Sequence, residues 1–511
     1  MFPQLFRTKS IEQLVREADR PEHRLQRVLG PWSMAALGIG AIIGTGIYIL
    51  AGTAAAGETF EVESWLKAPL LDLLLHGSEA TGLTGRPGAG PAVAVSFVLV
   101  ALVCVLAAFC YAELSSAIPI AGSAYTYTYA TLGELAAWIM GWNLILAYAV
   151  SNMAVAVGFS AYFDSLLGSL GITLPRTLME PTFFGGEPTG AYFNLPCSLV
   201  ILFLTVLLVT GLRESSRANT IMVFVKIAAL LVFVFAAMPH VEVEHWRPFF
   251  PNGWQGVLAG SSLVFFTYIG FDSVATAAEE CKNPQRDLPF GILMSLAACA
   301  VLYVAVALVL TGIQPWETLA NAAPVAQALE AIGLGNVQRW VTVGALTGMV
   351  SSLLVFQLGL TRIGFAMSRD RLLPAAFSKV HPRYRTPHIS TWTAGLLVGI
   401  PAGMFDIGTL AEIANIGTLF AFVMVSVAVL VLRRTQPELK RGFRVPWSPW
   451  LPLLSLLACL TLMAGLPVET WLQFFVWIGI GLAVYFLYSG RRSPLRQGQE
   501  NGASGSNSKG Q

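Results

Sequence analysis

Twelve apolar runs, separated by short polar segments, dominate this sequence and leave few ways for it to fold. Only 12% of its 511 residues are charged, and the mean hydropathy is +0.65. Soluble domains carry about 25% charged residues, and a helix needs about 20 apolar residues to cross a bilayer. We therefore expect an all-α polytopic membrane protein with about 12 transmembrane helices. The expected spans are 32–56, 91–116, 134–162, 193–212, 218–238, 254–277, 289–311, 338–366, 389–405, 408–432, 448–466 and 469–489.

The positive charges are distributed unevenly over the loops between these runs. If the N-terminus lies in the cytoplasm, 25 of the 31 Lys and Arg residues fall in cytoplasmic loops and tails. Positive residues favour the cytoplasmic side of a membrane, so both termini of this multi-pass plasma-membrane protein are expected there. The predicted organisation is a cytoplasmic N-terminal segment at 1–31, one membrane domain at 32–490 and a disordered cytoplasmic tail at 491–511.

The first apolar run contains a glycine-rich interruption at Leu37–Tyr48, with four glycines between Gly38 and Gly46. Glycine costs a helix about 1 kcal/mol per residue relative to alanine. In hydrocarbon, the backbone groups freed by a break must be satisfied by protein or by a polar cavity. One interpretation is a broken helix whose second half directs its positive dipole end at a substrate carboxylate. The other is close helix–helix packing through small residues, and this stretch alone does not decide between them.

The sixth run contains a comparable interruption at Ser261–Ser273. Gly270 lies in its middle, and Asp272 brings a carboxyl group to a depth where an acid usually faces a cavity or a partner. The alternative is a bent helix with Asp272 paired to nearby backbone. The two interruptions lie five runs apart, so the second group of five has the opposite orientation, as in inverted-repeat transporters. The predicted repeats are 32–238 and 254–432, followed by helices 11 and 12 at 448–489.

One lysine lies inside a predicted span. Lys226 is about eight residues into the fifth run, which places it about 12 Å from the cytoplasmic end. Burying a charged lysine near the bilayer centre costs at least about 2.5–3.5 kcal/mol, which favours loss of its proton. The residue is therefore a candidate for loading and releasing a proton during transport. The alternative is a structural lysine that snorkels to the interface or is permanently paired.

Several short stretches match the sequence pattern of a known family. They are the glycine-rich first run, Cys110–Leu114, Gly122–Tyr125, Gly141–Leu146, Tyr268–Asp272, Glu279–Pro289, Ala366–Asp370 and Asn415–Phe420. With them the chain resembles the cationic amino acid transporter branch of the amino acid–polyamine–organocation superfamily. The resemblance covers about residues 30–490, and the run Lys282–Pro289 is specific.

The resemblance implies an amino acid permease domain with a LeuT-type 5+5 inverted repeat and broken helices 1 and 6. Main-chain groups of the first break would receive the substrate carboxylate, and carbonyl groups of the sixth span its ammonium group. In proton-coupled relatives a fifth-span lysine takes the place of sodium, and Lys226 matches it. The implied substrate-binding residues are Ile42, Ile43, Gly44, Thr45, Gly46, Phe266, Thr267 and Ile269. The implied neighbours of Lys226 are carbonyl groups near Gly38 and Ala41, and Ser351 or Ser352.

A few further residues near the expected site carry expectations of their own. Ala147 stands where many bacterial relatives have an acid in span three, so an acid at that place is not available to pair with Lys226. Asp272 and Glu412 are candidate pathway residues, and Glu412 is alternatively an outer interface residue. Glu113 is expected to pair at a helix end rather than to carry protons. The tyrosines expected in an interfacial aromatic belt are Tyr125, Tyr127 and Tyr129.

These features predict a proton-coupled symporter that imports L-amino acids by alternating access, with spans three, six, eight and ten shaping the side-chain pocket. The expected partners are an L-amino acid, protons and the lipid bilayer, without a cofactor, nucleic acid or an obligatory protein partner. The alternatives are an amino acid exchanger or polyamine carrier of the same fold and, in another class, a membrane amino acid sensor. The six cysteines lack metal-ligand spacing and no nucleophile has a placed base, so neither a metal site nor an enzyme is expected.

Overall fold

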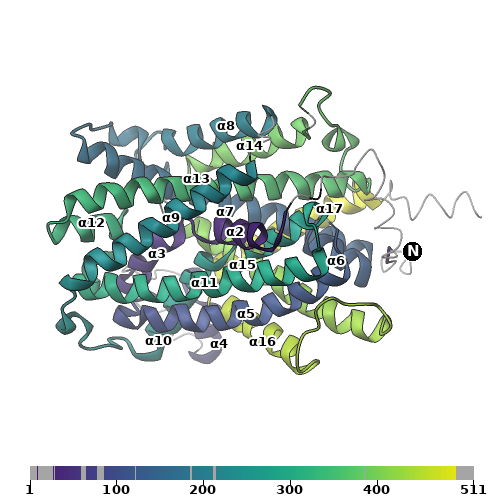
Figure 1. The fold of residues 1–511 in the computed structure, drawn as a ribbon, viewed down its shortest axis with the longest axis horizontal. Coiled ribbons are helices and arrows are strands. Elements are labelled where there is room, and N and C mark those ends of the chain that lie inside the picture. Colours follow the sequence, from purple (N-terminus) through teal and green to yellow (C-terminus); the bar gives the residue numbers. More distant parts are fainter. Residues whose placement is uncertain are drawn as a thin grey trace, which may run out of the picture.

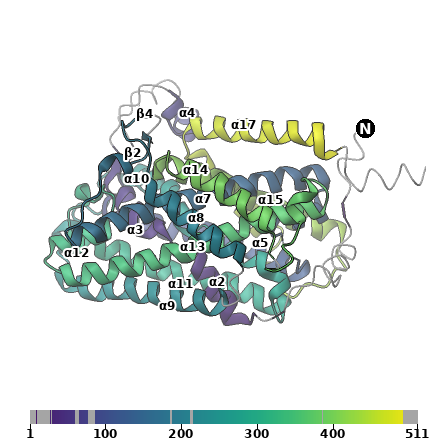
Figure 2. The same cartoon turned by 90° about the horizontal axis from the view of Figure 1, so that it is seen from above.

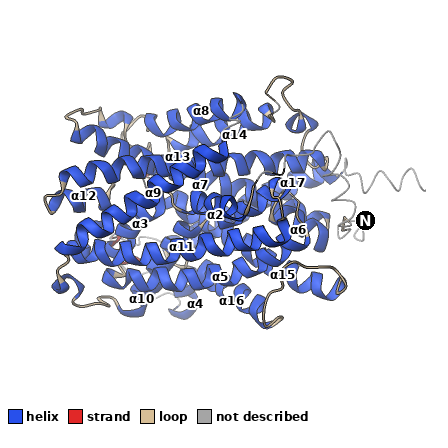
Figure 3. Cartoon of the chain, in the orientation of Figure 1, coloured by secondary structure: helices blue, strands red, loops and turns tan. Residues whose placement is uncertain are grey.

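The computed structural model shows a predominantly helical chain (Figure 1, Figure 3). It describes residues 8–9, 27, 29–58, 65–76, 86–120, 122–184, 187–210, 215–384 and 386–490. Most of the helices run along the long axis of the molecule in Figure 1. The predicted tail at 491–511 lies outside the described residues, as does most of the predicted N-terminal segment at 1–31.

Within the described residues, eight helices are long and apolar enough to cross a membrane, or nine if the bent pair α2 (Pro31–Ile42) and α3 (Thr45–Ala56) forms one span. A helix lies in each of the twelve predicted ranges, although three of these helices are short. The chain is a multi-pass membrane protein, and the number of twelve crossings stays a prediction.

The long helices are α5 (Val93–Ala117), α7 (Glu134–Ser169), α9 (Ser215–Ala237), α11 (Pro284–Ile313), α13 (Gly335–Arg369), α15 (Ile407–Thr435) and α17 (Val468–Val484), with a sixth span at Gly253–Glu280. The short ones are α8 (Leu195–Thr210), α14 (His388–Ala402) and α16 (Trp450–Ala464).

Large apolar side chains cover the outer faces of these helices, while polar groups lie inside. On α9, Phe224 is 70% exposed, whereas Lys226, on the opposite face of the same helix, is fully buried. Lipid solvates apolar side chains, and polar groups in a bilayer are satisfied within the protein. The distribution is therefore the one expected for a helix bundle surrounded by lipid.

The long helices enclose both interrupted segments. Helix α2 packs against α9, α11 and α13, and α3 packs against α10 (Gly253–Val264), the first part of the sixth span. Figure 2 shows α17 along one edge of the molecule and α9 along the opposite edge, with α3 between them. Non-helical backbone is tolerated at membrane depth only where protein or a cavity surrounds it. Both interruptions meet this condition.

The described parts of the long loop after α3 form short elements. Helix α4 (Leu70–His76) has seven residues, too few to cross a bilayer, in agreement with the sequence. Its first amide donates to the Leu466 carbonyl (3.0 Å), between α16 and α17. The strand β1 (Gly57–Glu58) pairs with β2 (Arg86–Pro87), so the loop returns to the end of α3. A second ribbon, β3 (Phe183–Phe184) with β4 (Glu187–Pro188), follows α7.

The prediction of an interfacial aromatic belt was wrong. Tyr125, Tyr127 and Tyr129 lie on α6 (Ala124–Thr131) and are at most 2% exposed. The Tyr125 hydroxyl donates to Asp370 (2.7 Å) and the Tyr129 hydroxyl to Glu134 (3.1 Å). A buried tyrosine is tolerated where its hydroxyl finds an acceptor. Aromatic content alone could not reveal these two carboxylates.

Candidate functional site

The first interruption is a true break of the helix at Ile43 and Gly44, where α2 and α3 meet at a bend of 44°. The Gly44 amide turns back to the Ile42 carbonyl (2.9 Å) instead of reaching the Gly40 carbonyl, its helical partner. The Gly40 oxygen therefore loses its helical donor, and the Ile43 oxygen lies in the break itself. Unpaired carbonyl groups at membrane depth cost several kcal/mol each, so other groups must donate to them.

Two side chains from other helices donate to both of these oxygens. The Lys226 Nζ lies 2.6 Å from the Gly40 oxygen and 2.8 Å from the Ile43 oxygen. The Ser352 hydroxyl, on α13, lies 3.0 Å from each. No ion pair joins Lys226 to a carboxylate in the part of the chain that the structure describes. A buried ammonium group thus holds the first break by donating to main-chain oxygens.

The predicted neighbours of Lys226 are only partly the observed ones. Ser352 is one of the two predicted serines, and the accepting carbonyls lie within two residues of the predicted positions. Gly38 is inside the intact part of α2, where a carbonyl keeps its helical donor, so the free acceptors occur nearer the break. The observed set is Gly40, Ile43 and Ser352, whereas the predicted set was Gly38, Ala41 and Ser351 or Ser352.

The sixth span departs from the α-helix over a longer stretch. Helix α10 continues into two 3-10 segments, η8 (Phe265–Tyr268) and η9 (Phe271–Glu280). Between them Gly270 has φ +128°, a conformation that side chains rarely allow. The Thr267 hydroxyl donates to the Val264 carbonyl (2.7 Å), and the Ser273 amide (3.0 Å) and hydroxyl (2.5 Å) both donate to the Gly270 carbonyl. The Val264 and Gly270 carbonyls are thus satisfied by groups of their own segment, while the Ser262 and Asp272 carbonyls accept from Asn415 (2.8 Å) and Ser123 (3.4 Å) of other elements.

The two breaks lie directly against each other. A Cβ atom added to Gly46 would come within 2.8 Å of the Thr267 Cα, and one added to Gly270 within 2.8 Å of the Ala41 carbonyl carbon. Such distances leave no room for a side chain, so the two backbones are in contact. The structure therefore brings the predicted substrate-binding residues to one buried place, although their binding role stays a prediction. These residues are Ile42, Ile43, Gly44, Thr45, Gly46, Phe266, Thr267 and Ile269.

A small cavity adjoins the second break. Its walls come from α7, the sixth span, α13 and α15, which are the four spans expected to shape a side-chain pocket. The apolar lining residues are Leu144, Ala147, Ile269, Phe356 and Ala421, and the polar ones are Tyr148, Ser151, Asp272 and Thr418. The lining is thus largely apolar, with one ionisable carboxyl group. Ala147 lines this cavity.

Two tyrosine hydroxyls at the site were missed by the sequence reasoning. Tyr303 on α11 donates to the Ile42 carbonyl (2.9 Å), next to the carbonyls that Lys226 holds. Tyr148 on α7 donates to the Asp272 carboxylate (2.8 Å). Both are buried within long apolar helices. The only available signal was a hydroxyl inside an apolar span, which points to an internal acceptor without identifying it.

Glu412 lies away from the breaks, on α15. It forms an ion pair with Arg86 of β2 and accepts from the Thr470 hydroxyl of α17 (3.1 Å). These contacts tie the end of the long loop after α3 to two spans. A pathway role for Glu412 stays a prediction, and its observed contacts are structural.

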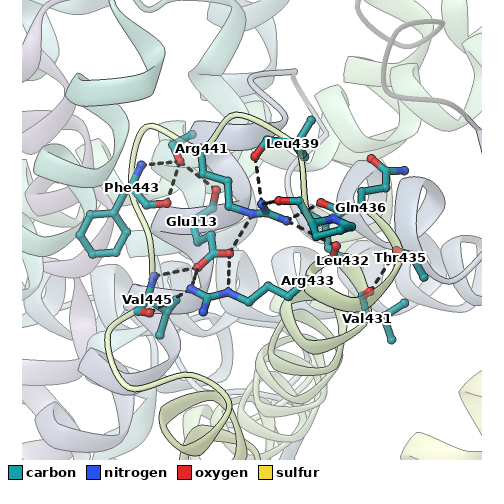
Figure 4. Close-up of polar contacts among 12 residues, drawn as sticks. Glu113, Val431, Leu432, Arg433, Thr435, Gln436, Leu439, Arg441, Phe443 and Val445 are labelled. Atoms are coloured by element: carbon teal, nitrogen blue, oxygen red, sulfur yellow. Dashed lines mark hydrogen bonds and ion pairs between the residues drawn. The ribbon is translucent and has the colours of Figure 1, made fainter.

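Glu113 is paired at the end of α5, as expected. Arg433 donates to its carboxylate from Nε (2.9 Å) and Nη2 (2.5 Å), and the Val445 amide donates at 2.7 Å (Figure 4). The Arg441 Nε lies 3.2 Å from the same carboxylate. A bidentate arginine pair fixes a carboxylate in orientation as well as position. Glu113 therefore fastens α5 to the segment that follows α15.

The chemistry available at the breaks is that of hydrogen bonding rather than of covalent reaction. Among the described residues, no group of three or more His, Cys, Asp and Glu side chains could hold a metal ion. The breaks offer amides at the start of α3, main-chain carbonyls and one buried ammonium group. Amides at a helix N-terminus favour anions, and carbonyls at a C-terminus favour cations. The arrangement suits a molecule that carries both charges.

Comparison with known proteins identifies the family to which the chain belongs. The sequence profile of the family described as amino acid permease matches residues 29–486. The methylthioribose transporter of Bacillus subtilis (strain 168) is 44% identical over 493 residues, or 96% of this chain and 99% of that protein. The branched-chain amino acid permease BcaP of the same organism is 44% identical over 496 residues, with the same coverage. Cationic amino acid transporter 4, vacuolar, of Arabidopsis thaliana is 37% identical over 440 residues, or 85% of this chain and 68% of that protein. The matched region contains both broken helices and Lys226, and the chain therefore belongs to the amino acid permease family of membrane transporters.

Proposed function

We propose that this permease is a proton-coupled symporter that imports L-amino acids across the plasma membrane by alternating access. In this proposal twelve spans include two inverted repeats of five, both termini face the cytoplasm, and protons are the coupling ions, without another cofactor. The observation that carries the proposal is the contact of the Lys226 ammonium group with the Gly40 and Ile43 carbonyls. It joins an ionisable group directly to the break at which substrate is expected to bind.

The substrate carboxylate is proposed to bind at the start of α3. Gly44 precedes this helix, and no side chain caps it. The first amides of α3, from Thr45 onward, therefore present the positive end of a twelve-residue helix inside the protein. The ammonium group is proposed to bind carbonyls of the sixth span, between Phe266 and Ile269, which lie against Gly46. Both charges of the amino acid are then recognised by main-chain atoms.

Proton coupling follows from what Lys226 does at the break. A charged donor makes hydrogen bonds about twice as strong as a neutral one, so the protonated form holds the Gly40 and Ile43 carbonyls more tightly. Loss of the proton weakens this contact and loosens the geometry at the start of α3. Because Lys226 has no carboxylate partner in the described chain, deprotonation leaves no unpaired negative charge behind.

The side-chain cavity supports neutral substrates with an apolar side chain. Leu144, Ile269 and Phe356 are among its apolar lining residues, and no basic residue lines it. Burying apolar surface contributes about 25 cal/mol per Å² to the free energy of binding, which favours a substrate with a branched aliphatic side chain. A 44% identical relative is named as a branched-chain amino acid permease, in agreement with this choice. Another at the same identity is named for methylthioribose, so that compound belongs in the test.

The test uses the purified protein in proteoliposomes. Uptake of radiolabelled L-leucine is measured with and without an inwardly directed proton gradient, and with methylthioribose, L-lysine and L-alanine as competitors. The proposal expects accumulation above the equilibrium level only with the gradient, and competition by apolar amino acids in the L form. Uptake that requires internal amino acid and ignores the gradient would identify an exchanger instead. Binding without flux would identify a sensor.

A further inference from the structure

The carboxyl group of Asp272 is the one carboxyl group on the wall of the side-chain cavity. Asp272 is the second residue of η9 and is 3% exposed. Its Oδ2 accepts a hydrogen bond from the Tyr148 hydroxyl (2.8 Å), whereas its Oδ1 has no hydrogen-bond partner among the described residues. A buried carboxylate oxygen without a donor costs free energy, and a charged one costs more. The group is thus incompletely satisfied at a place that faces open space.

The surroundings of Asp272 offer no cation to balance a negative charge. Helix α2 carries no titratable residue, and α7 contributes Tyr148, which is neutral. On α13, Arg362 is committed to an ion pair with Glu280, at the far end of η9. Lys226 donates to the carbonyls of the first break. No ion pair that the described residues form includes Asp272, and the other titratable side chains that interact with it are Cys104 and Tyr111 of α5.

We propose that Asp272 is a second proton-carrying residue of the transport cycle, distinct from Lys226. When the cavity opens to the outside, an O–H bond forms at Oδ1 with a proton delivered by water, and the carboxyl group becomes neutral. When the cavity opens to the cytoplasm, this O–H bond breaks and the proton passes to water. Tyr148 keeps its own proton throughout and holds Oδ2 in place. The inference rests on the proposed symport and adds a second site to it.

The position of Asp272 explains why a neutral carboxyl group belongs there. An apolar substrate side chain in the cavity would exclude water from Oδ1, and a charged carboxylate would then be buried with one oxygen that accepts no hydrogen bond. Protonation removes this penalty, so occupation of the cavity and protonation of Asp272 favour each other. Ala147 leaves the cavity without another acid that could share the proton.

The experiment compares the wild type with Asp272→Asn in proteoliposomes, with Asp164→Asn as the control. Asp164 is an exposed carboxylate on α7, the helix that carries Tyr148. The number of protons moved with each L-leucine is obtained from the reversal potential of substrate-driven current. Asparagine keeps the neutral state, so Asp272→Asn is expected to lower this ratio by one. The control is expected to keep the wild-type ratio.

An unchanged ratio in an Asp272→Asn protein that still transports would overturn the inference. If that variant does not fold or transport, Tyr148→Phe tests the inference instead. It removes a donor to the carboxylate, which disfavours the charged form, so the midpoint of uptake against pH should rise by about one unit. A midpoint that does not change rejects the inference. A defect of either variant that is confined to L-lysine uptake also rejects it, because Asp272 would then bind cationic substrate side chains. Absence of proton movement in the wild type would instead reject the proposed symport.

Discussion

The two broken spans solve the same problem in different ways. In the first span, the carbonyls of Gly40 and Ile43 are satisfied by Lys226 and Ser352, which come from two other helices. In the sixth span, the nearby carbonyls of Val264 and Gly270 accept from hydroxyls three residues further along the same segment. The first break is held mainly by side chains of other helices, and the second mainly by hydroxyls of its own segment.

This difference assigns the moving part to the first span. A local turn made by hydroxyls within three residues persists whatever its neighbours do. A break held by a lysine from another helix depends on the position of that helix and on the charge of the lysine. The comparison therefore predicts that substitutions at the first break alter coupling, whereas removal of a hydroxyl that supports the second break alters local stability only. The contact between the two breaks is shared and should be the most sensitive feature of all.

Gly270→Ala is expected to have the largest effect. The methyl group would collide with the Ala41 carbonyl carbon, and φ +128° is strained for alanine. Overpacking costs about 1–3 kcal/mol and backbone strain about 1–3 kcal/mol. Substrate binding and uptake should both fall by at least about 30-fold, measured by L-leucine binding to purified protein and by uptake in proteoliposomes.

Two control variants separate the causes in Gly270→Ala. Gly333→Ala introduces alanine at φ +78° where no atom lies within 4 Å, so it carries strain without the collision. Gly46→Ala carries the collision with Thr267 at a glycine whose φ is not positive. If contact between the breaks matters, Gly46→Ala loses binding and Gly333→Ala keeps it. Full binding by Gly46→Ala would show that the breaks need not touch.

Lys226→Ala should have the next largest effect, and it should separate accumulation from binding. It removes the charged donor from the Gly40 and Ile43 carbonyls but leaves Ser352 in place. Accumulation driven by a proton gradient should disappear, while L-leucine binding weakens by about tenfold or less. Lys282→Ala, at an exposed position, is the control and should behave as the wild type. Gradient-driven accumulation by Lys226→Ala would remove the lysine from the coupling mechanism.

Ser352→Ala should have a smaller effect of the same kind. Its hydroxyl shares both acceptors with Lys226, so neither carbonyl is left without a donor. Loss of one hydrogen bond costs about 1 kcal/mol, which corresponds to about fivefold in uptake at limiting substrate. Ser426→Ala, a buried serine that donates to the Phe422 carbonyl (2.9 Å), is the matched control. An effect as large as that of Lys226→Ala would show that the serine, rather than the ammonium group, holds the break.

The sequence was most informative at positions where a residue type destabilises a membrane-spanning helix and therefore indicates a functional or structural exception. Four glycines in an apolar run indicated the first break, and Gly270 with Asp272 indicated the second. Lys226 was identified because a lysine at that depth is costly. Each of these signals concerns a single position. Together with the resemblance to the family, they were sufficient to predict that the two interrupted spans come together.

The contacts of these residues could not be predicted to the same detail. The acceptors of Lys226 were displaced by one or two residues because the sequence does not fix which carbonyl loses its helical donor. The hydroxyls of Tyr148 and Tyr303 were missed because their acceptors lie 124 and 261 residues away along the chain. Tyr125 of α6 was misplaced for the same reason, since its acceptor Asp370 lies 245 residues away. Hydrophobic patterning identifies spans, but it carries no information on which polar groups meet between them.

Thr267→Val should have the smallest effect and tests whether the second break supports itself. The substitution keeps the shape of the side chain and removes only the bond from its hydroxyl to the Val264 carbonyl. One neutral hydrogen bond is worth about 0.5–1.5 kcal/mol, which should lower thermal stability by a few degrees. Because the proposed substrate contact uses the main chain of Thr267, L-leucine affinity and the proton ratio should stay within about twofold of the wild type. A change in the proton ratio would mean that the hydroxyl support of the second break also takes part in coupling, and the division between a moving break and a fixed one would fail.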